Sequence, residues 1–116
     1  MSLGLWGEEQ AADFLAQKGY RIIGRRYRCR EGEIDLVAVH GSCLCFIEVK
    51  LRKNAAMGAA REYVTRSKQQ KLRTAALHYL MEHPSRLQPR FDVVEVYAPY
   101  GEKTRSPEIV HWEQAF

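Results

Sequence analysis

Residues 33–51 read EIDLVAVHGSCLCFIEVKL and contain two apolar segments rich in strand-forming residues, 33–40 and 43–51. Gly41 and Ser42 lie between them, and such a pair between two strand-like segments is typical of a two-residue hairpin connection. The stretch therefore predicts an antiparallel β-hairpin. Three charged residues interrupt its apolar pattern, and these are Asp35, Glu48 and Lys50.

The segments around the hairpin show helical and extended patterns in a simple order. Apolar residues recur at helical spacing before Gly19, a helix stop, and again after a loop of small residues at 54–60. The order helix, three strands, helix, two strands predicts one α/β domain over residues 1–116, with a mixed central sheet flanked by two helices. Helices are predicted over 7–18 and 61–82, and further strands over 20–27, 91–98 and 109–112. The apolar face of the second helix would comprise Val64, Leu72, Ala75, Ala76 and Tyr79.

Composition excludes several classes of protein. Of the 116 residues, 46% are hydrophobic and 28% charged, as in an ordinary globular domain rather than a disordered or low-complexity chain. The apolar runs are far shorter than the roughly 20 residues that cross a bilayer, and the N-terminus has no secretory pattern, so a cytoplasmic protein without membrane contact is expected. The cysteines lack a CxxC pair and the histidines lack ligand spacing, which predicts reduced thiols and no zinc site. These residues are Cys29, Cys43, Cys45, His40, His78, His83 and His111.

The net charge of +4 is unevenly distributed along the chain. Residues 1–73 carry 14 Lys and Arg against 8 Asp and Glu, whereas residues 74–116 carry 4 against 6. Twelve of the eighteen basic residues are arginines, whose planar fork suits bidentate contact with phosphate. A polyanionic partner, most of all DNA, is therefore expected, and solvated basic faces are the alternative explanation. The candidates for phosphate contacts are Arg25, Arg28, Arg30, Arg52 and Arg66.

Asp35, Glu48 and Lys50 lie within apolar strands, where a charge is costly unless it is paired or binds a metal. The strand period of two places Glu48 and Lys50 on one side, and the hairpin brings Asp35 alongside them. Two carboxylates favour a hard cation such as Mg²⁺ or Mn²⁺, and a neighbouring ammonium can orient a water or stabilise a developing anion. This combination predicts phosphodiester hydrolysis. The alternatives are that Asp35 caps backbone amides and that Glu48 and Lys50 form a solvent-facing pair.

The same residues resemble known protein families. An acidic residue on one strand and Glu-x-Lys on the next is similar to the PD-(D/E)xK signature of restriction-endonuclease-like nucleases. A longer stretch, about residues 5–96, resembles the YraN family of predicted endonucleases. The sequence departs from that family at Arg26, where the family usually has asparagine. The resemblance is carried by Gly7-Glu8 with Ala11, Gly19-Tyr20, Gly32-Glu33-Ile34-Asp35-Leu36, Ile47-Glu48-Val49-Lys50 with Arg52, Lys68, and Arg90-Phe91-Asp92-Val93.

The resemblance implies a restriction-endonuclease-like fold and two further site residues. In archaeal Holliday-junction resolvases, which have a similar layout, a glutamate from the first helix joins the metal cluster, and Glu8 matches that position. The alternative for Glu8 is structural, because a helix dipole favours any carboxylate in the first turn. Many relatives of this fold place a Lys or Gln from the following helix near the phosphate, and Lys68 matches that position. The alternative for Lys68 is a solvated helix face.

The resulting hypothesis is a Mg²⁺- or Mn²⁺-dependent nuclease that acts on DNA, with branched DNA among the candidate substrates. Asp35 and Glu48 would be metal ligands, Glu8 a third ligand, and Lys50 a catalytic residue. The alternatives are a nucleic-acid-binding module of the same fold without turnover and a protein-interaction subunit. A homodimer is an alternative to a monomer, since many relatives act as dimers. Glu33 is expected to satisfy backbone amides or to pair with an arginine near the turn, and Asp92 to pair with Arg90 or another base.

Overall fold

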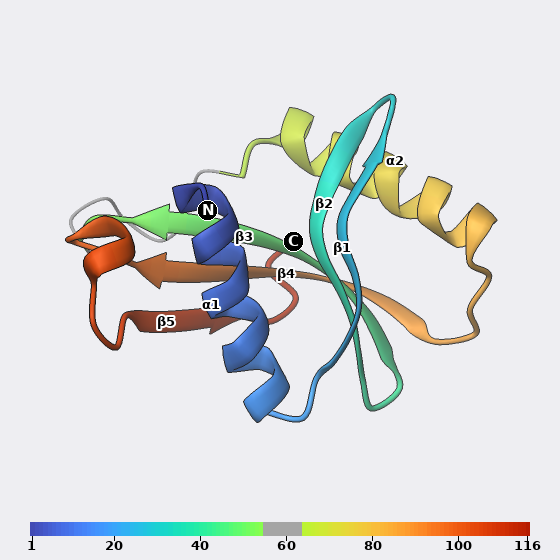
Figure 1. Cartoon of the computed structure of the whole chain (residues 1–116). Helices are drawn as coiled ribbons and strands as arrows, with labels where there is room; N and C mark the ends of the chain where they lie inside the picture. Colours follow the sequence, from blue (N-terminus) through green and yellow to red (C-terminus); the bar gives the residue numbers. More distant parts are fainter. Residues whose placement is uncertain (55–63) are drawn as a thin grey trace.

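The computed structural model of the chain describes residues 1–54 and 64–116 (Figure 1). The order of its elements, helix, three strands, helix, two strands, is the predicted one. Within these described residues, no helix is long and apolar enough to cross a membrane. The elements are α1 (Leu3–Gln17), β1 (Arg21–Cys29), β2 (Gly32–His40), β3 (Cys43–Arg52), α2 (Arg66–Glu82), β4 (Gln88–Tyr97), a 3-10 turn (Gly101–Lys103) and β5 (Glu108–Trp112).

The strands form one mixed sheet in the order β1-β2-β3-β4-β5. Neighbouring strands are antiparallel except β3 and β4, which run parallel because the connection between them, containing α2, returns the chain to the other end of the sheet. The predicted hairpin is confirmed, since His40 pairs with Cys43. Gly41 in its turn has a φ of 58°, a left-handed conformation that glycine adopts without steric cost. The prediction of a mixed central sheet flanked by helices is therefore confirmed.

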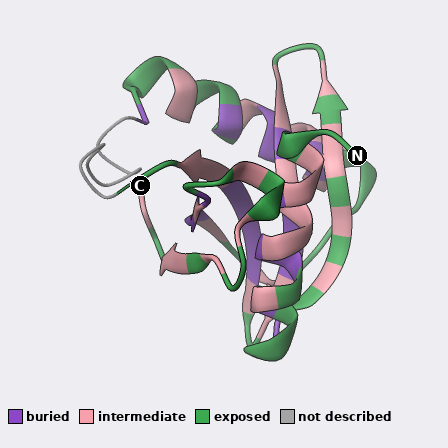
Figure 2. Cartoon of the chain, turned by 60° about the vertical axis from the view of Figure 1, so that its left-hand side comes forward, coloured by how far each residue is buried: buried purple, intermediate pink, exposed green. Residues whose placement is uncertain are grey.

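α1 and α2 lie on opposite faces of the sheet, and each covers its own hydrophobic core (Figure 1). Successive side chains of a strand point to opposite faces. In β3, Leu44 and Phe46 therefore pack in the core under α2, whereas Cys45 and Ile47 pack in the core under α1. Burial on both faces explains the continuous apolar run at residues 43–47 of this strand. Figure 2 shows the buried residues concentrated on the sheet and on the helix faces turned toward it.

α1 begins at Leu3, about one turn before the predicted start at residue 7. Ser2 extends the helix because its hydroxyl accepts the backbone N–H of Leu5 at 3.2 Å, which satisfies an otherwise unpaired donor. Glu8 consequently lies in the second turn, and the first turn contains no acidic residue. Because the dipole effect falls off within the first turn, the helix dipole does not explain Glu8, and that alternative is wrong.

α2 begins at Arg66, and the Thr65 hydroxyl caps it by accepting the backbone N–H of Lys68 at 3.1 Å. The predicted helix is confirmed for residues 66–82, while its first residues, 61–63, and most of the predicted loop, 55–60, lie outside the described residues. The predicted apolar face is confirmed. All of its members are buried in the core under α2, and these are Val64, Leu72, Ala75, Ala76 and Tyr79.

Candidate functional site

Asp35 lies where the pairing of β2 with β3 ends. The last paired residues on this side are Leu36 and Ile47. Just beyond them, Oδ2 of Asp35 accepts the backbone N–H of Val49 at 2.8 Å, so the carboxylate replaces a main-chain acceptor of the ladder. The backbone contact considered as an alternative for Asp35 is therefore present. It also fixes the carboxylate beside the strand that carries Glu48.

Glu48 is held between two lysines. Its Oε1 lies 3.3 Å from Nζ of Lys50 and 2.7 Å from Nζ of Lys68. Lys50 is two residues along the same strand, as the strand period predicts, and Lys68 comes from the first turn of α2. Only 11% of the Glu48 side chain is exposed. Glu48 therefore belongs to an internal cluster, and the alternative of a solvent-facing pair does not hold for it.

A cavity of about 310 Å³, here called the acidic cavity, lies between these elements. Glu8 of α1, Asp35 of β2 and Glu48 of β3 all line it, so the three predicted carboxylates share one cavity. Lys50 is outside the lining and reaches the cluster through its contact with Glu48. The other lining residues are Arg26, Gly32, Glu33, Lys68, Lys71 and Leu72.

A larger cavity, of about 540 Å³, lies at the ends of β3 and β4. Lys53, Tyr97 and Lys103 are among its lining residues, and Glu108 is the single carboxylate in the described lining. One carboxylate is a poor cage for a hard divalent cation, which requires several oxygen ligands. The smaller cavity, and not the larger one, therefore contains the side chains that support metal chemistry.

Charge within the acidic cavity is unevenly compensated. Burial and the negative charge of Glu48 raise the pKa of Asp35 from 3.8 to about 7. Burial lowers the pKa of Lys50, and the adjacent Lys68 contributes in the same direction. Burial alone would lower the pKa of Lys68, but its hydrogen bond to Glu48, its contact with Lys50 and the negative charges of Glu48 and Asp35 together outweigh burial and raise that pKa. The site thus holds an acid that resists ionisation beside a lysine that releases its proton more readily than usual.

Arg26 forms part of the cavity wall in a left-handed backbone conformation. Its φ is 50°, a region in which asparagine and glycine are favoured over arginine. Its Nε lies 3.1 Å from Glu8 and 3.8 Å from Glu33. The asparagine that the YraN family usually has here suits the same backbone, so the departure at this position keeps the fold at some cost in strain. It also adds a cation beside Glu8.

The donor chemistry of the acidic cavity fits a hard divalent cation. Mg²⁺ and Mn²⁺ favour carboxylate oxygens together with water, and Asp35, Glu48 and Glu8 supply three carboxylates to one space. The raised pKa of Asp35 records the mutual repulsion of these groups as well as burial. A bound cation would relieve that repulsion.

The arginines predicted to contact a nucleic acid differ in exposure. Arg52 is largely buried, since 10% of its side chain is exposed and its Nε lies 3.5 Å from Glu95. The ion pair with Glu95 therefore explains why Arg52 is buried, and little of its side chain is exposed for contact with phosphate. The other four are exposed, and these are Arg25, Arg28, Arg30 and Arg66. Two of them form surface ion pairs, which contribute little to stability: Arg25 with Glu9 at 2.6 Å and Arg28 with Glu33 at 3.3 Å.

Both carboxylates predicted to pair with arginines do so. Asp92 is fully buried, and its Oδ2 lies 2.8 Å from Nη2 of Arg90 and 2.8 Å from Nε2 of His111. Glu33 pairs with Arg28, although it also lines the acidic cavity. Asp92 is thus a structural carboxylate, whereas Glu33 lies at the edge of the candidate site.

Two basic lining residues were not selected as site residues from the sequence. Lys71 follows Lys68 by three residues, and helical spacing places such a pair on one face, so the sequence contained a signal for it. Arg26 had no such signal, because its position depends on a left-handed backbone that the arginine itself does not favour. The site therefore contains more positive charge than the sequence indicated.

Comparison with known proteins gives a consistent set of relatives. The model of the uncharacterised protein family UPF0102 matches residues 7–96. This range is nearly the same as the stretch, about residues 5–96, that resembles the YraN family. The chain is 42% identical to a UPF0102 protein of Rhodococcus opacus (strain B4), over 100% of this chain and 97% of the relative. It is 46% identical to a UPF0102 protein of Chlorobium limicola, over 99% and 92% of the two chains. It is 47% identical to a UPF0102 protein of Chlorobaculum tepidum, over 98% and 91%.

Proposed function

The chain belongs to the UPF0102 family, and we propose that it is a divalent-metal-dependent nuclease that hydrolyses phosphodiester bonds of DNA. The observation that carries this proposal is the convergence of Asp35, Glu48 and Glu8 on one cavity, with Lys50 and Lys68 in contact with Glu48. The confirmed order of helices and strands and the Glu-x-Lys strand support a place in the restriction-endonuclease-like superfamily. Fold alone does not imply activity, so the proposal rests on the site.

Asp35, Glu48 and Glu8 would hold Mg²⁺ or Mn²⁺. When bound, such an ion supplies positive charge next to the phosphorus and a water of lowered pKa. Asp35 is positioned for this role because the Val49 amide fixes one of its oxygens. Its proton must leave before it can act as a ligand, since a ligating carboxylate is deprotonated.

Lys50 and Lys68 supply the positive charge of the reaction. Lys68 reaches into the cavity from α2 and is suited to contact a phosphate oxygen, where it stabilises charge that develops during attack. Lys50 lies behind Glu48 with a lowered pKa, which suits it to orient the attacking water or to accept its proton. The two lysines thus have separate roles, although both contact Oε1 of Glu48.

Exposed basic residues around the cavity support DNA as the substrate. Arg66 lies at the start of α2, five residues before Lys71 of the cavity wall, and Arg28 and Arg30 lie at the end of the β1–β2 hairpin. Phosphate contacts by such side chains position a nucleic acid without reading its sequence. Recognition through phosphate contacts would suit a structure-specific substrate such as branched DNA. A homodimer would extend the contact surface of so small a domain.

The decisive experiment is cleavage of labelled duplex, single-stranded, flap and four-way-junction DNA with Mg²⁺ or Mn²⁺. Wild type is expected to cleave at least one substrate, and Lys50→Ala and Asp35→Asn are expected to abolish cleavage. Lys103→Ala, which removes an exposed lysine outside the acidic cavity, is the matched control and keeps the wild-type rate. Retention of the wild-type rate by both Lys50→Ala and Asp35→Asn would show that the assignment is wrong.

A non-catalytic nucleic-acid-binding module is the second candidate. The contacts of Lys50 and Lys68 favour it, because they already compensate the charge of Glu48 without a metal. This function predicts binding that does not depend on metal and weakens with salt, with log K falling by about 0.9 per phosphate contact on duplex DNA. Tight metal-independent binding without cleavage of any substrate would select it over the nuclease.

A further inference from the structure

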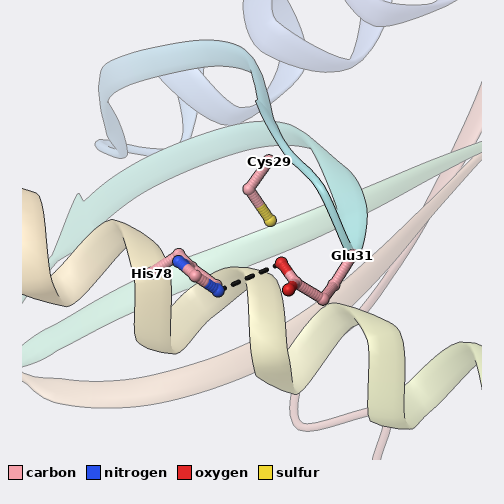
Figure 3. A group of neighbouring side chains, drawn as sticks. All are labelled: Cys29, Glu31 and His78. Carbon is pink, nitrogen blue, oxygen red and sulfur yellow. Dashed lines mark ion pairs between the residues drawn. The ribbon is translucent and has the colours of Figure 1, made fainter.

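Cys29, Glu31 and His78 form a second cluster of metal-ligating side chains, and none of them lines the acidic cavity (Figure 3). They come from the end of β1, the β1–β2 turn and α2, and their side chains point toward one another. One thiol sulfur, one carboxylate oxygen and one imidazole nitrogen all lie within 4.8 Å of one another. Nε2 of His78 and Oε2 of Glu31 lie 3.0 Å apart.

These separations are near those of a tetrahedral zinc site. Zinc bonds of about 2.0–2.2 Å to nitrogen and oxygen and about 2.3 Å to sulfur place the ligand atoms roughly 3.3–3.6 Å apart. The His78 and Glu31 atoms are already close to this spacing, and since the sulfur of Cys29 lies within 4.8 Å of both, it needs to approach by about an ångström at most. The side chains of His78 and Glu31 are 42% and 39% exposed, so an ion can enter without opening the core.

We propose that Cys29, Glu31 and His78 bind a borderline-soft divalent cation, with Zn²⁺ as the best match. A thiolate and an imidazole are preferred ligands of Zn²⁺, whereas Mg²⁺ is selected by oxygen donors. The carboxylates of the acidic cavity offer only oxygen, so the two clusters select different ions. Three protein ligands leave the fourth tetrahedral position to water or to a group of a bound partner.

A cation at this cluster would tie the β1–β2 hairpin to α2. Cys29 pairs with Gly32 at the end of the hairpin, and a Cβ added to Gly32 would lie 3.3 Å from the carbonyl oxygen of Lys71. The hairpin and the helix are therefore already in close contact. Gly32 and Lys71 also line the acidic cavity. The cation would thus link two walls of that cavity from outside it, without contacting its carboxylates.

The test is a titration of the reduced protein with Co²⁺, whose absorption spectrum reports thiolate ligation and tetrahedral geometry. Wild type is expected to show a thiolate-to-cobalt charge-transfer band, which Zn²⁺ then removes by displacing Co²⁺. Cys29→Ser is expected to lack the band, and His78→Gln to weaken binding by about tenfold or more. Cys43→Ser is the matched control, because it removes a half-buried thiol outside the cluster and is expected to keep the band.

Asp35→Asn separates this proposal from the nuclease proposal. It is expected to leave the charge-transfer band unchanged, and excess Mg²⁺ is expected not to displace Co²⁺ from the thiolate. The inference is overturned if folded wild-type protein shows no band, if Cys29→Ser keeps the band, or if Cys43→Ser loses it. Circular dichroism establishes folding in each case, and His78→Gln changes an exposed side chain of α2. Absence of DNA cleavage would refute the nuclease alone.

Discussion

Replacement of Asp35 by asparagine is expected to stabilise the metal-free protein at neutral and higher pH. Asparagine keeps an oxygen that can accept the Val49 N–H, so the backbone contact is preserved. It removes the negative charge that lies beside Glu48 in a partly buried position. The substitution therefore imitates the protonated carboxyl at every pH. Loss of a proposed ligand and gain of stability are expected from the same change.

The size of the effect follows from the pKa of Asp35, which folding raises from 3.8 to about 7. An acid whose pKa is higher in the folded state stabilises the fold below the unfolded-state pKa, and that stabilisation is lost as the pH rises through the folded-state pKa. Each pH unit between the two values is worth about 1.4 kcal/mol, so the upper limit is about 4 kcal/mol between pH 4 and pH 7. Residual solvent contact of the carboxyl reduces this limit.

Urea unfolding at pH 4, 6 and 8 in the presence of a chelator measures the difference. Wild type and Asp35→Asn should differ little at pH 4, and the variant should be more stable by a growing margin toward pH 8. Asp13→Asn, at an exposed position of α1, is the matched control and should follow wild type. Mn²⁺ should then stabilise wild type by mass action and leave Asp35→Asn unaffected. Parallel pH profiles for wild type and Asp35→Asn would refute the electrostatic account of this site.

Lys68→Ala removes a cation 2.7 Å from Glu48 and is expected to slow single-turnover cleavage by about 100-fold; an unchanged rate would remove Lys68 from the catalytic set. Arg26→Asn is expected to raise the unfolding free energy by about 1 kcal/mol, because arginine no longer occupies a left-handed backbone. The same variant should bind Mn²⁺ more tightly in calorimetry, since it lacks the guanidinium 3.1 Å from Glu8, and weaker binding would contradict this. Asp92→Asn is expected to lower the unfolding free energy by about 3 kcal/mol with Mn²⁺ affinity unchanged, and a large loss of affinity would contradict its structural role.

The fold was predictable because residues 33–51 combine a two-residue turn with two apolar strands, and a continuous apolar strand requires cover on both faces. The start of α1 was less predictable. It depends on one serine hydroxyl at Ser2, ahead of the apolar periodicity that indicated the helix. The parallel alignment of β3 with β4 required only that a helix connect them. Local sequence patterns thus determined the order of the helices and strands, whereas the Ser2 cap determined where α1 begins.

The site was predictable where strand geometry alone places side chains together. The period of two brings Lys50 to Glu48, and the hairpin brings Asp35 alongside. Contacts between distant elements were not predictable in the same way. Cys29 and His78 are separated by nearly fifty residues, so that spacing along the chain gave no sign of the cluster they form with Glu31. The prediction of no zinc site from the sequence considered only ligand residues that lie close together along the chain.

Asp35 and Asp92 show how differently the surroundings of two carboxylates in the same sheet can act on their charge. Burial alone raises the pKa of both. Around Asp92, hydrogen bonds from His111 and Arg90 outweigh burial, and the net effect is a lowered pKa. Around Asp35, the charge of Glu48 adds to burial instead. The surroundings of Asp92 thus stabilise its negative charge, whereas those of Asp35 oppose it, and a cation at the proposed site would relieve that opposition.

The two aspartates should therefore respond to the same substitution with opposite signs. At pH 8 without metal, Asp35→Asn removes a charge that its surroundings oppose, and Asp92→Asn removes a charge that Arg90 and His111 require. The first change should raise the free energy of unfolding and the second should lower it, although both replace one carboxylate oxygen by an amide nitrogen. If both variants were destabilised to a similar extent, Asp35 would be a structural carboxylate like Asp92, and its raised pKa would no longer support a cation site.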